Sequence, residues 1–209
     1  MTIRLSSPDP ANFKEKYSLP ITANGKKFDW NTYMFPHAFI QVEEETKHEI
    51  LKNLFTHASQ HNRRWEINYI RSSERDILRY ASFKKHINKS EVGVEKGVEI
   101  LDYIIQEKNR RYQIMANESS NNYLDTKEVL KTNLLIIDKP EKFLFLTRSE
   151  EDFETFKLIN RILRLGRAAG MHIVFLSEEH MPSYLMANIT YSLTQDSFPS
   201  HSSIFLKRA

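Results

Sequence analysis

One junction in the chain has the position of a phosphate-binding site but not its residues. A short apolar run at 38–42 precedes a stretch whose apolar residues recur on one face of a helix. A phosphate loop at such a junction uses glycines to turn backbone N–H groups toward the phosphates, and adds a lysine and a hydroxyl. The residues here are Glu43, Glu44, Glu45, Thr46, Lys47, His48 and Glu49.

Glycine is missing from this junction, and no glycine lies between Gly25 and Gly93. Without glycines the backbone cannot wrap a phosphate, and three consecutive carboxylates would repel one. We therefore predict no orthodox ATP site here, although Lys47 is a candidate for a shifted catalytic lysine. The acids are instead expected to bond the free N–H groups of a helix and to complement its dipole.

Two further sets of residues suggest binding by their type and spacing. His57 and His61 lie one helical turn apart, a spacing that can bind zinc, but no HExxH pattern accompanies them. We interpret them as surface histidines and predict no metal site. Four basic residues near Trp65 and Tyr80 are candidates for contact with a nucleic-acid backbone. These are Arg63, Arg64, Lys84 and Lys85.

Composition favours one globular α/β domain. The chain has 209 residues, a formal charge of +3 and no cysteine, which excludes disulfides and thiolate chemistry. No signal peptide or apolar run long enough to cross a membrane is evident, so we expect a cytoplasmic protein without a membrane span. The charge is too small to identify a nucleic-acid binder by itself.

Apolar runs alternate with helical patterns along the chain. We predict an irregular leader over 1–36 and a single α/β domain over 37–209, with a mostly parallel sheet covered by helices on both faces. Expected strands lie at 38–42, 65–71, 133–138, 170–177, 189–194 and 203–206. Expected helices lie within 72–80, where Ser73 is a candidate N-cap, over 90–118 with Ser90 as the cap, and over 151–166; a polar loop is expected at 115–127.

Four segments carry a resemblance to a known family. They are LPITANGKKFDWNTYMFPHAFI at 19–40, a helix containing RRYQIM within 98–115, LLIID within 134–144, and GRAAGMH within 158–193. In this order they resemble the motor domain of the FtsK/SpoIIIE DNA translocases, whose relatives power type VII secretion and some conjugation systems. The resemblance implies a RecA-like P-loop NTPase fold and assembly into rings.

The resemblance also implies that the nucleotide chemistry is degenerate. The family's second nucleotide motif has an aspartate for Mg²⁺ followed by a glutamate that activates water, and here Asp138 is followed by Lys139. The alternative for Asp138 is an acid that caps a turn at the end of a strand. The family's Thr-Gln sensor of the γ-phosphate corresponds to Ser177 and Glu178, and the alternative there is a polar loop.

Arg167 corresponds to the family's arginine finger, which reaches into the nucleotide site of the neighbouring subunit. Its presence beside a degenerate site suggests a subunit that completes a partner's active site. The alternative is that Gly166 and Gly170 bracket a tight helix-to-strand turn and that Arg167 is a solvated surface charge.

These features lead to the hypothesis that the chain is a pseudo-ATPase, and we expect it to bind no cofactor. It would act as a binding or regulatory subunit, docking on an active FtsK/SpoIIIE-type homologue or self-associating into a ring, and would be encoded by a host, a mobile element or a phage. Two alternatives stay open: an active ATP- and Mg²⁺-dependent DNA translocase with an atypical phosphate loop, and an accessory DNA-binding module.

Overall fold

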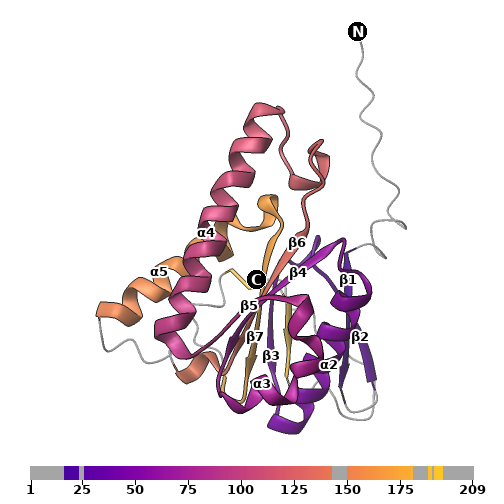
Figure 1. Cartoon of the computed structure of the whole chain (residues 1–209), viewed down its shortest axis with the longest axis vertical. Coiled ribbons are helices and arrows are strands. Elements are labelled where there is room, and N and C mark those ends of the chain that lie inside the picture. The colour runs from indigo at the N-terminus through magenta and orange to yellow at the C-terminus, as the bar shows by residue number, and fades with distance from the viewer. Residues whose placement is uncertain (1–16, 24–25, 143–149, 181–187, 190, 195–209) are drawn as a thin grey trace.

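The centre of the protein is a six-stranded parallel sheet (Figure 1). The computed structural model describes residues 17–23, 26–142, 150–180, 188–189 and 191–194. Every residue of two central strands is buried, as continuous apolar runs predict for a parallel sheet covered on both faces. In sheet order the strands are β5 (Ile87–Val92), β4 (Trp65–Arg71), β6 (Thr132–Asp138), β7 (Met171–Ser177), β3 (His37–Gln41) and β8 (Tyr191–Leu193).

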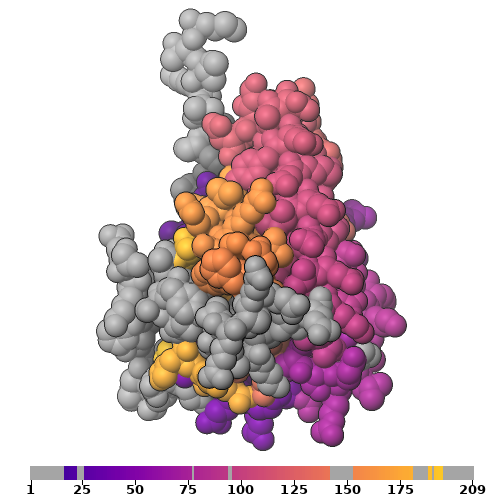
Figure 2. Space-filling view, turned by 90° about the vertical axis from the view of Figure 1, so that its left-hand side faces the viewer, coloured from indigo at the N-terminus to yellow at the C-terminus, as the bar shows by residue number. Residues whose placement is uncertain are grey.

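Helices cover both faces of this sheet, which confirms the predicted fold class. On one face α2 (Glu44–Gln60) packs beside a hairpin of β1 (Ser18–Ala23) and β2 (Lys26–Asn31). On the other face α4 (Gly93–Asn117) and α5 (Glu150–Leu165) form the outer layer (Figure 2). Each layer contributes its own apolar core, so the sheet is buried between two clusters.

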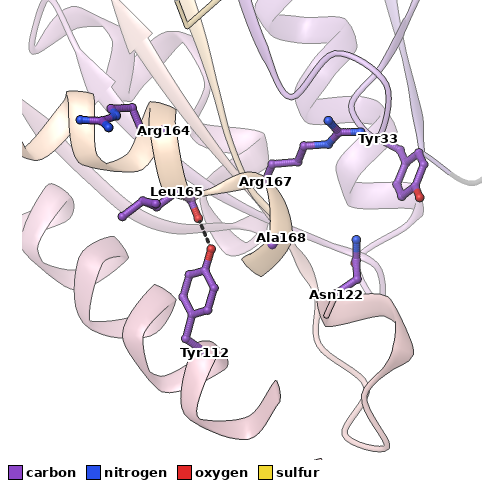
Figure 3. A pocket seen from close by; sticks show the side chains of 7 residues that line it. All are labelled: Tyr33, Tyr112, Asn122, Arg164, Leu165, Arg167 and Ala168. Atoms are coloured by element: carbon purple, nitrogen blue, oxygen red, sulfur yellow. Dashed lines mark hydrogen bonds between the residues drawn. The ribbon is translucent and has the colours of Figure 1, made fainter. Parts of the chain in front are cut away.

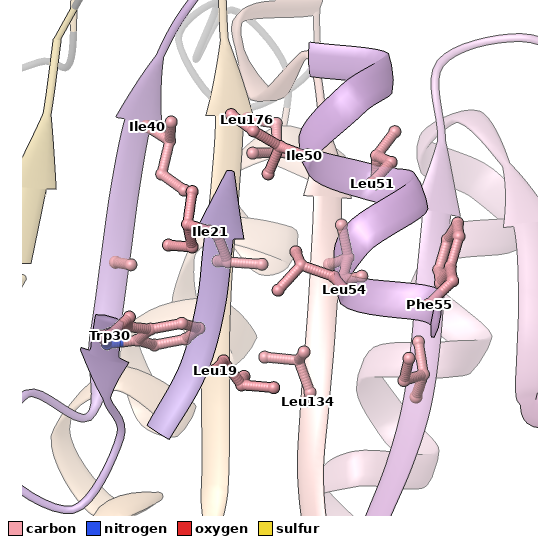
Figure 4. Close-up of a cluster of buried hydrophobic side chains, with 14 of the residues drawn as sticks. Leu19, Ile21, Trp30, Ile40, Ile50, Leu51, Leu54, Phe55, Leu134 and Leu176 are labelled. Atoms are coloured by element: carbon pink, nitrogen blue, oxygen red, sulfur yellow. The ribbon is translucent and has the colours of Figure 1, made fainter. Parts of the chain in front are cut away.

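The hairpin corrects the prediction of an irregular leader over 1–36 at Ser18–Ala23 and Lys26–Asn31, and residues 1–16 of that leader lie outside the described residues. Its strands pair antiparallel, and Leu19, Ile21 and Trp30 have no exposed surface. They pack against α2 and the sheet (Figure 4). Leu19 and Ile21 alternate with polar or half-buried neighbours as a strand requires, but Pro20 between them suggested a turn. Proline is compatible with the edge of a small sheet, where a backbone N–H is not needed.

The helix predicted over 90–118 begins later than expected. Residues 87–92 form strand β5, which among the described strands pairs with β4 alone, so Ser90 lies in a strand and does not cap a helix. Gly93 then turns the chain into α4 with φ of 76°, a conformation that favours glycine. The polar sequence of β5 concealed it, because an exposed edge strand needs few apolar residues.

Short helices connect the main elements. The helix expected within 72–80 is α3 (Arg75–Arg79); Glu74 occupies its N-cap position, and Ser73 Oγ accepts a hydrogen bond from Arg75 N at 3.2 Å. The 3-10 turns are η1 (Ala81–His86), η2 (Tyr123–Asp125), η3 (Pro140–Lys142) and η4 (Arg167–Ala169). The strand predicted at 203–206 lies outside the described residues.

Candidate functional site

The residues singled out at the phosphate-type junction meet at the carboxyl ends of the parallel strands. Only Val42 and Glu43 connect β3 to α2. Asp138 closes β6 and Ser177 closes β7, the two strands that come before β3 in the sheet order. Because carboxyl ends of parallel strands share one edge, the fold brings these segments together.

Lys47 lies at the centre of this edge in a buried ion pair. Its Nζ is 2.9 Å from Asp138 Oδ1 and 2.7 Å from Glu44 Oε2. The side chains of Lys47 and Asp138 are each only 1% exposed. Ser72 Oγ donates a hydrogen bond of 2.5 Å to the other oxygen of Asp138. A buried ammonium is costly unless it is paired, and two carboxylates here satisfy it.

Lys139 extends this network to the third segment of the edge. Its Nζ is 2.9 Å from Glu44 Oε2 and 2.7 Å from Glu178 Oε1. Partial burial opposes the charged forms, but hydrogen bonds from Lys47 and Lys139 lower the pKa of Glu44 to about 2. Likewise, hydrogen bonds to Glu178 and Glu44 outweigh burial and raise the pKa of Lys139 above its usual value. We call Glu44, Lys47, Asp138, Lys139 and Glu178 the edge network.

The edge network corrects part of the interpretation of the acids. Glu43, at the N-cap position of α2, makes no side-chain hydrogen bond to the helix, and Glu44 pairs with two lysines instead. Glu44 and Glu45 do lie in the first helical turn, where they complement the dipole. Of the rest of this stretch, Thr46 is buried and His48 and Glu49 are half-buried.

Other polar groups surround the edge network, among them Ser72 and Asp76, which the sequence did not single out. Tyr80 OH shares a 2.6 Å hydrogen bond with Nδ1 of His48, whose Nε2 lies 3.1 Å from Glu44 Oε1. Burial and the nearby Asp138 raise the pKa of Asp76. Their position in the sequence could have indicated them, because Ser72 and Asp76 follow the end of β4 at the same edge of the sheet. The third predicted segment also folds inward, with Ser177 Oγ donating a 2.7 Å hydrogen bond to Glu141 Oε2.

Arg167 lies at the opposite edge, in turn η4 at the amino end of β7. Seven residues of β7 separate the two edges, a span of roughly 20 Å. Arg167 is exposed, and its guanidinium carbon lies 5.8 Å from the centre of the Tyr33 ring (Figure 3). It therefore lies far from the edge network of its own chain.

The glycines around Arg167 form the tight turn that the sequence suggested. Gly170 has φ of 71°, and a Cβ there would lie 2.6 Å from the ring of Tyr123. A Cβ on Gly166 would lie 2.5 Å from the carbonyl oxygen of Ile162. Met171 N closes the turn with a 3.0 Å hydrogen bond to Gly166 O. The structure thus confirms the predicted tight helix-to-strand turn between Gly166 and Gly170. This turn fixes the point on the surface at which the side chain of Arg167 emerges.

The RRYQIM segment of α4 holds the same turn in place. Arg111, only 2% exposed, donates hydrogen bonds to Ala169 O at 2.9 Å and Lys131 O at 2.6 Å. Tyr112 OH donates a 2.7 Å hydrogen bond to Leu165 O (Figure 3). The result is a shallow hollow of about 270 Å³. It is lined by Tyr33, Tyr112, Asn122, Arg164, Leu165, Arg167 and Ala168.

The basic residues predicted to contact nucleic acid lie at this amino edge as well. Arg63 and Lys85 line one hollow, Arg63 and Arg64 line a second, and Lys84 is exposed beside Lys85. The rings of His57 and His61 lie 4.6 Å apart at the end of α2. Among the described residues, no three His, Asp or Glu side chains form a group suited to a metal ion. Within the same residues, no helix is long and apolar enough to cross a membrane.

No protein-family model and no curated protein sequence matches the chain. Several solved structures, in contrast, are similar to the chain. The cytoplasmic domain of EssC has a TM-score of 0.67 and 14% identity, over 85% of this chain and 36% of that one. The cytoplasmic domain of the Thermomonospora curvata type VII secretion ATPase EccC has a TM-score of 0.65 and 16% identity, over 89% and 25%. The pCW3 conjugation coupling protein TcpA, with ATPγS, has a TM-score of 0.65 and 13% identity, over 88% and 56%.

The chain has the fold of these ATPase domains. The similarity to FtsK/SpoIIIE-family ATPase domains covers most of the chain, which confirms the predicted P-loop ATPase architecture. The chain spans between a quarter and just over half of the length of these proteins. At identities of 13–16%, the similarity describes the fold and not the chemistry of the site.

Proposed function

We propose that this chain is a pseudo-ATPase of FtsK/SpoIIIE type, which works by binding within a translocation or secretion assembly in the cytoplasm. The observation that carries the proposal is the edge network. At the edge where this fold binds nucleotide, the lysine that would meet phosphate is already held by Asp138 and Glu44 at 2.9 and 2.7 Å.

The residues at this edge do not fit ATP with Mg²⁺. A two-residue connection without glycine cannot present a series of N–H groups to phosphates. The aspartate that would bind Mg²⁺ is paired with Lys47, and Lys139 stands where a base would activate water. Release of Lys47 from a buried pair costs about 3–5 kcal/mol, which weakens phosphate binding by roughly a hundredfold to several thousandfold.

Titration with a fluorescent ATP analogue and Mg²⁺ tests this part of the proposal. We expect no saturable binding up to millimolar concentration, for the wild type or for Lys47→Ala. Lys52→Ala, an exposed lysine on the same helix, is the matched control. Micromolar binding that Lys47→Ala abolishes and Lys52→Ala preserves would instead favour an active ATPase with an atypical loop.

Arg167 supports a partner role for the opposite edge. It is exposed, it emerges from a turn fixed by Gly166, Gly170 and Arg111, and it lies too far from the edge network to act there. We propose that it enters the nucleotide site of an active homologue, or meets the acid-rich edge of a second copy in a ring. Exposed Glu43 and Glu45 on that edge offer the complementary charge.

The test begins with capture of partners from the native host and proceeds to a reconstituted complex with any active ATPase found. Arginine fingers supplied in trans contribute on the order of 10³–10⁵ in rate. Arg167→Ala should therefore reduce the partner's ATPase rate strongly while the complex still forms. Arg161→Ala, an exposed arginine on α5, should leave the rate unchanged. An unaltered rate in an intact Arg167→Ala complex would refute the finger.

A further inference from the structure

A second hollow at the amino edge of the sheet has three cations among its nine described lining residues. It has a volume of about 590 Å³ and lies at the start of β4 and β5. Its polar lining comes from the turn after α2, from the end of η1 and from the residue before β6. We call it the basic groove, and its polar lining includes Asn62, Arg63, Lys85, His86, Asn88 and Lys131.

The cations of the basic groove have no carboxylate partner among the described residues. Within the part of the chain that the structure describes, Arg63, Lys85 and Lys131 form no ion pair, and all three are exposed. Glu66 is the acid among the described lining residues, and one of its carboxylate oxygens is held by neutral amide and hydroxyl groups. Its Oε1 accepts hydrogen bonds from Asn133 at 2.8 Å, Tyr103 at 3.1 Å and Asn88 at 3.3 Å.

The charge pairing in the basic groove is the opposite of that at the carboxyl edge of the sheet. There, Lys47 and Lys139 each meet two carboxylates, so their charges are compensated within the protein. At the amino edge the positive charge is left for an external anion. The charge also continues beyond the groove, because Arg63 lines an adjacent hollow of about 190 Å³ together with Arg64.

We propose that the basic groove binds the phosphodiester backbone of a nucleic acid. Contacts to a backbone need separated cations, and amide groups can add further hydrogen bonds. Three exposed cations and the exposed amide of Asn62 line the groove. A protein partner would instead need aromatic or aliphatic anchors. Trp65, the aromatic residue of the lining, is only 4% exposed. Binding should therefore be independent of sequence. This inference does not depend on the proposed pseudo-ATPase role, because the groove and the edge network lie on opposite edges.

Fluorescence anisotropy with labelled DNA tests the proposal over a range of KCl concentrations. Three phosphate contacts predict a slope of log K against log salt of about −2.7 for a duplex and about −2.1 for a single strand. The affinities for about 20 nucleotides or base pairs, compared at the same salt concentration, identify which form the groove prefers. Each of Arg63→Ala, Lys85→Ala and Lys131→Ala should reduce the magnitude of the slope by about 0.7–0.9.

Three exposed cations on the helices provide a matched control for charge. Lys52→Ala, Lys96→Ala and Arg161→Ala remove the same formal charge from other surfaces and should leave the slope unchanged. Thermal unfolding of each variant checks that the fold is retained. Equal losses in the control set would overturn the proposal, because the attraction would then be a property of net charge. Competition by polyglutamate as strong as competition by unlabelled DNA would also overturn it, in favour of an acidic peptide.

Discussion

Removing one member of the buried ion pair should cost far more stability than removing both. Asp138→Asn leaves the ammonium of Lys47 buried with one carboxylate, that of Glu44, whose side chain is 47% exposed. Lys47→Met leaves the carboxylate of Asp138 buried, with the hydrogen bond from Ser72 as its one side-chain partner among the described residues. Breaking a buried pair in this way costs about 3–5 kcal/mol. For a chain of this size the melting temperature should fall by roughly 6–20 °C in each single variant.

The double variant Lys47→Met/Asp138→Asn removes both charges and keeps the hydrogen bond from Ser72. Replacing a buried pair by neutral groups is commonly neutral or stabilising, so its stability should lie close to that of the wild type. The coupling free energy between the two positions should then exceed about 3 kcal/mol. Urea unfolding followed by circular dichroism measures all four corners of this cycle.

A surface pair on α5 provides the reference for this experiment. Lys157 and Glu154 are 2.6 Å apart but 53% and 62% exposed. Exposed pairs contribute about 0–1 kcal/mol, so the cycle of Lys157→Met and Glu154→Gln should show little coupling. The free energies of unfolding of the two single variants could instead add up in the double variant, or Asp138→Asn could leave the stability unchanged. Either result would mean that the edge network does not hold Lys47. The argument against phosphate binding would then fail.

The central sheet could be predicted well because burial on both faces leaves a direct trace in sequence. Strand β4 falls at the predicted residues, and the predictions for β6 and β7 differ from the structure by one residue at one end. Strand β5 and the hairpin of β1 and β2 were missed. Both lie at sheet edges, where a strand needs only one buried face or one neighbouring strand. Polar residues or a proline are therefore tolerated there.

The candidate site could be predicted in its residues but not in its pairings. Local rules assigned the carboxylate of Glu44 to the helix N-terminus, since capping needs only neighbours in sequence. In the structure Glu44 pairs with Lys139, which lies after β6. That pairing depends on strand order, which a single sequence does not specify. The lack of a described carboxylate partner for Arg63 and Lys85 was likewise beyond prediction, because it depends on which acids fold nearby.

Two further predictions concern stability. Gly170→Ala should destabilise the protein by about 2–5 kcal/mol in urea unfolding, because a left-handed φ adds to a clash with a ring at 2.6 Å. Gly93→Ala, with φ of 76° and nothing within 4 Å, should cost only about 1–2 kcal/mol; equal costs would contradict the clash. Burial lowers the pKa of His37 to about 3 and of His172 to about 4, so between those values and about 6.5 the unfolded chain binds more protons. Stability should therefore fall as pH falls, by about 2–3 kcal/mol per histidine from pH 7 to about 4.5. Burial also lowers the pKa of His57 to about 4, so part of the acid loss belongs to that residue. The loss between pH 7 and about 4.5 should therefore shrink by about 4–6 kcal/mol in His37→Gln/His172→Gln, and stay close to the wild-type loss in the exposed-histidine variant His61→Gln. A double variant that loses as much stability as the wild type would exclude His37 and His172 as a cause.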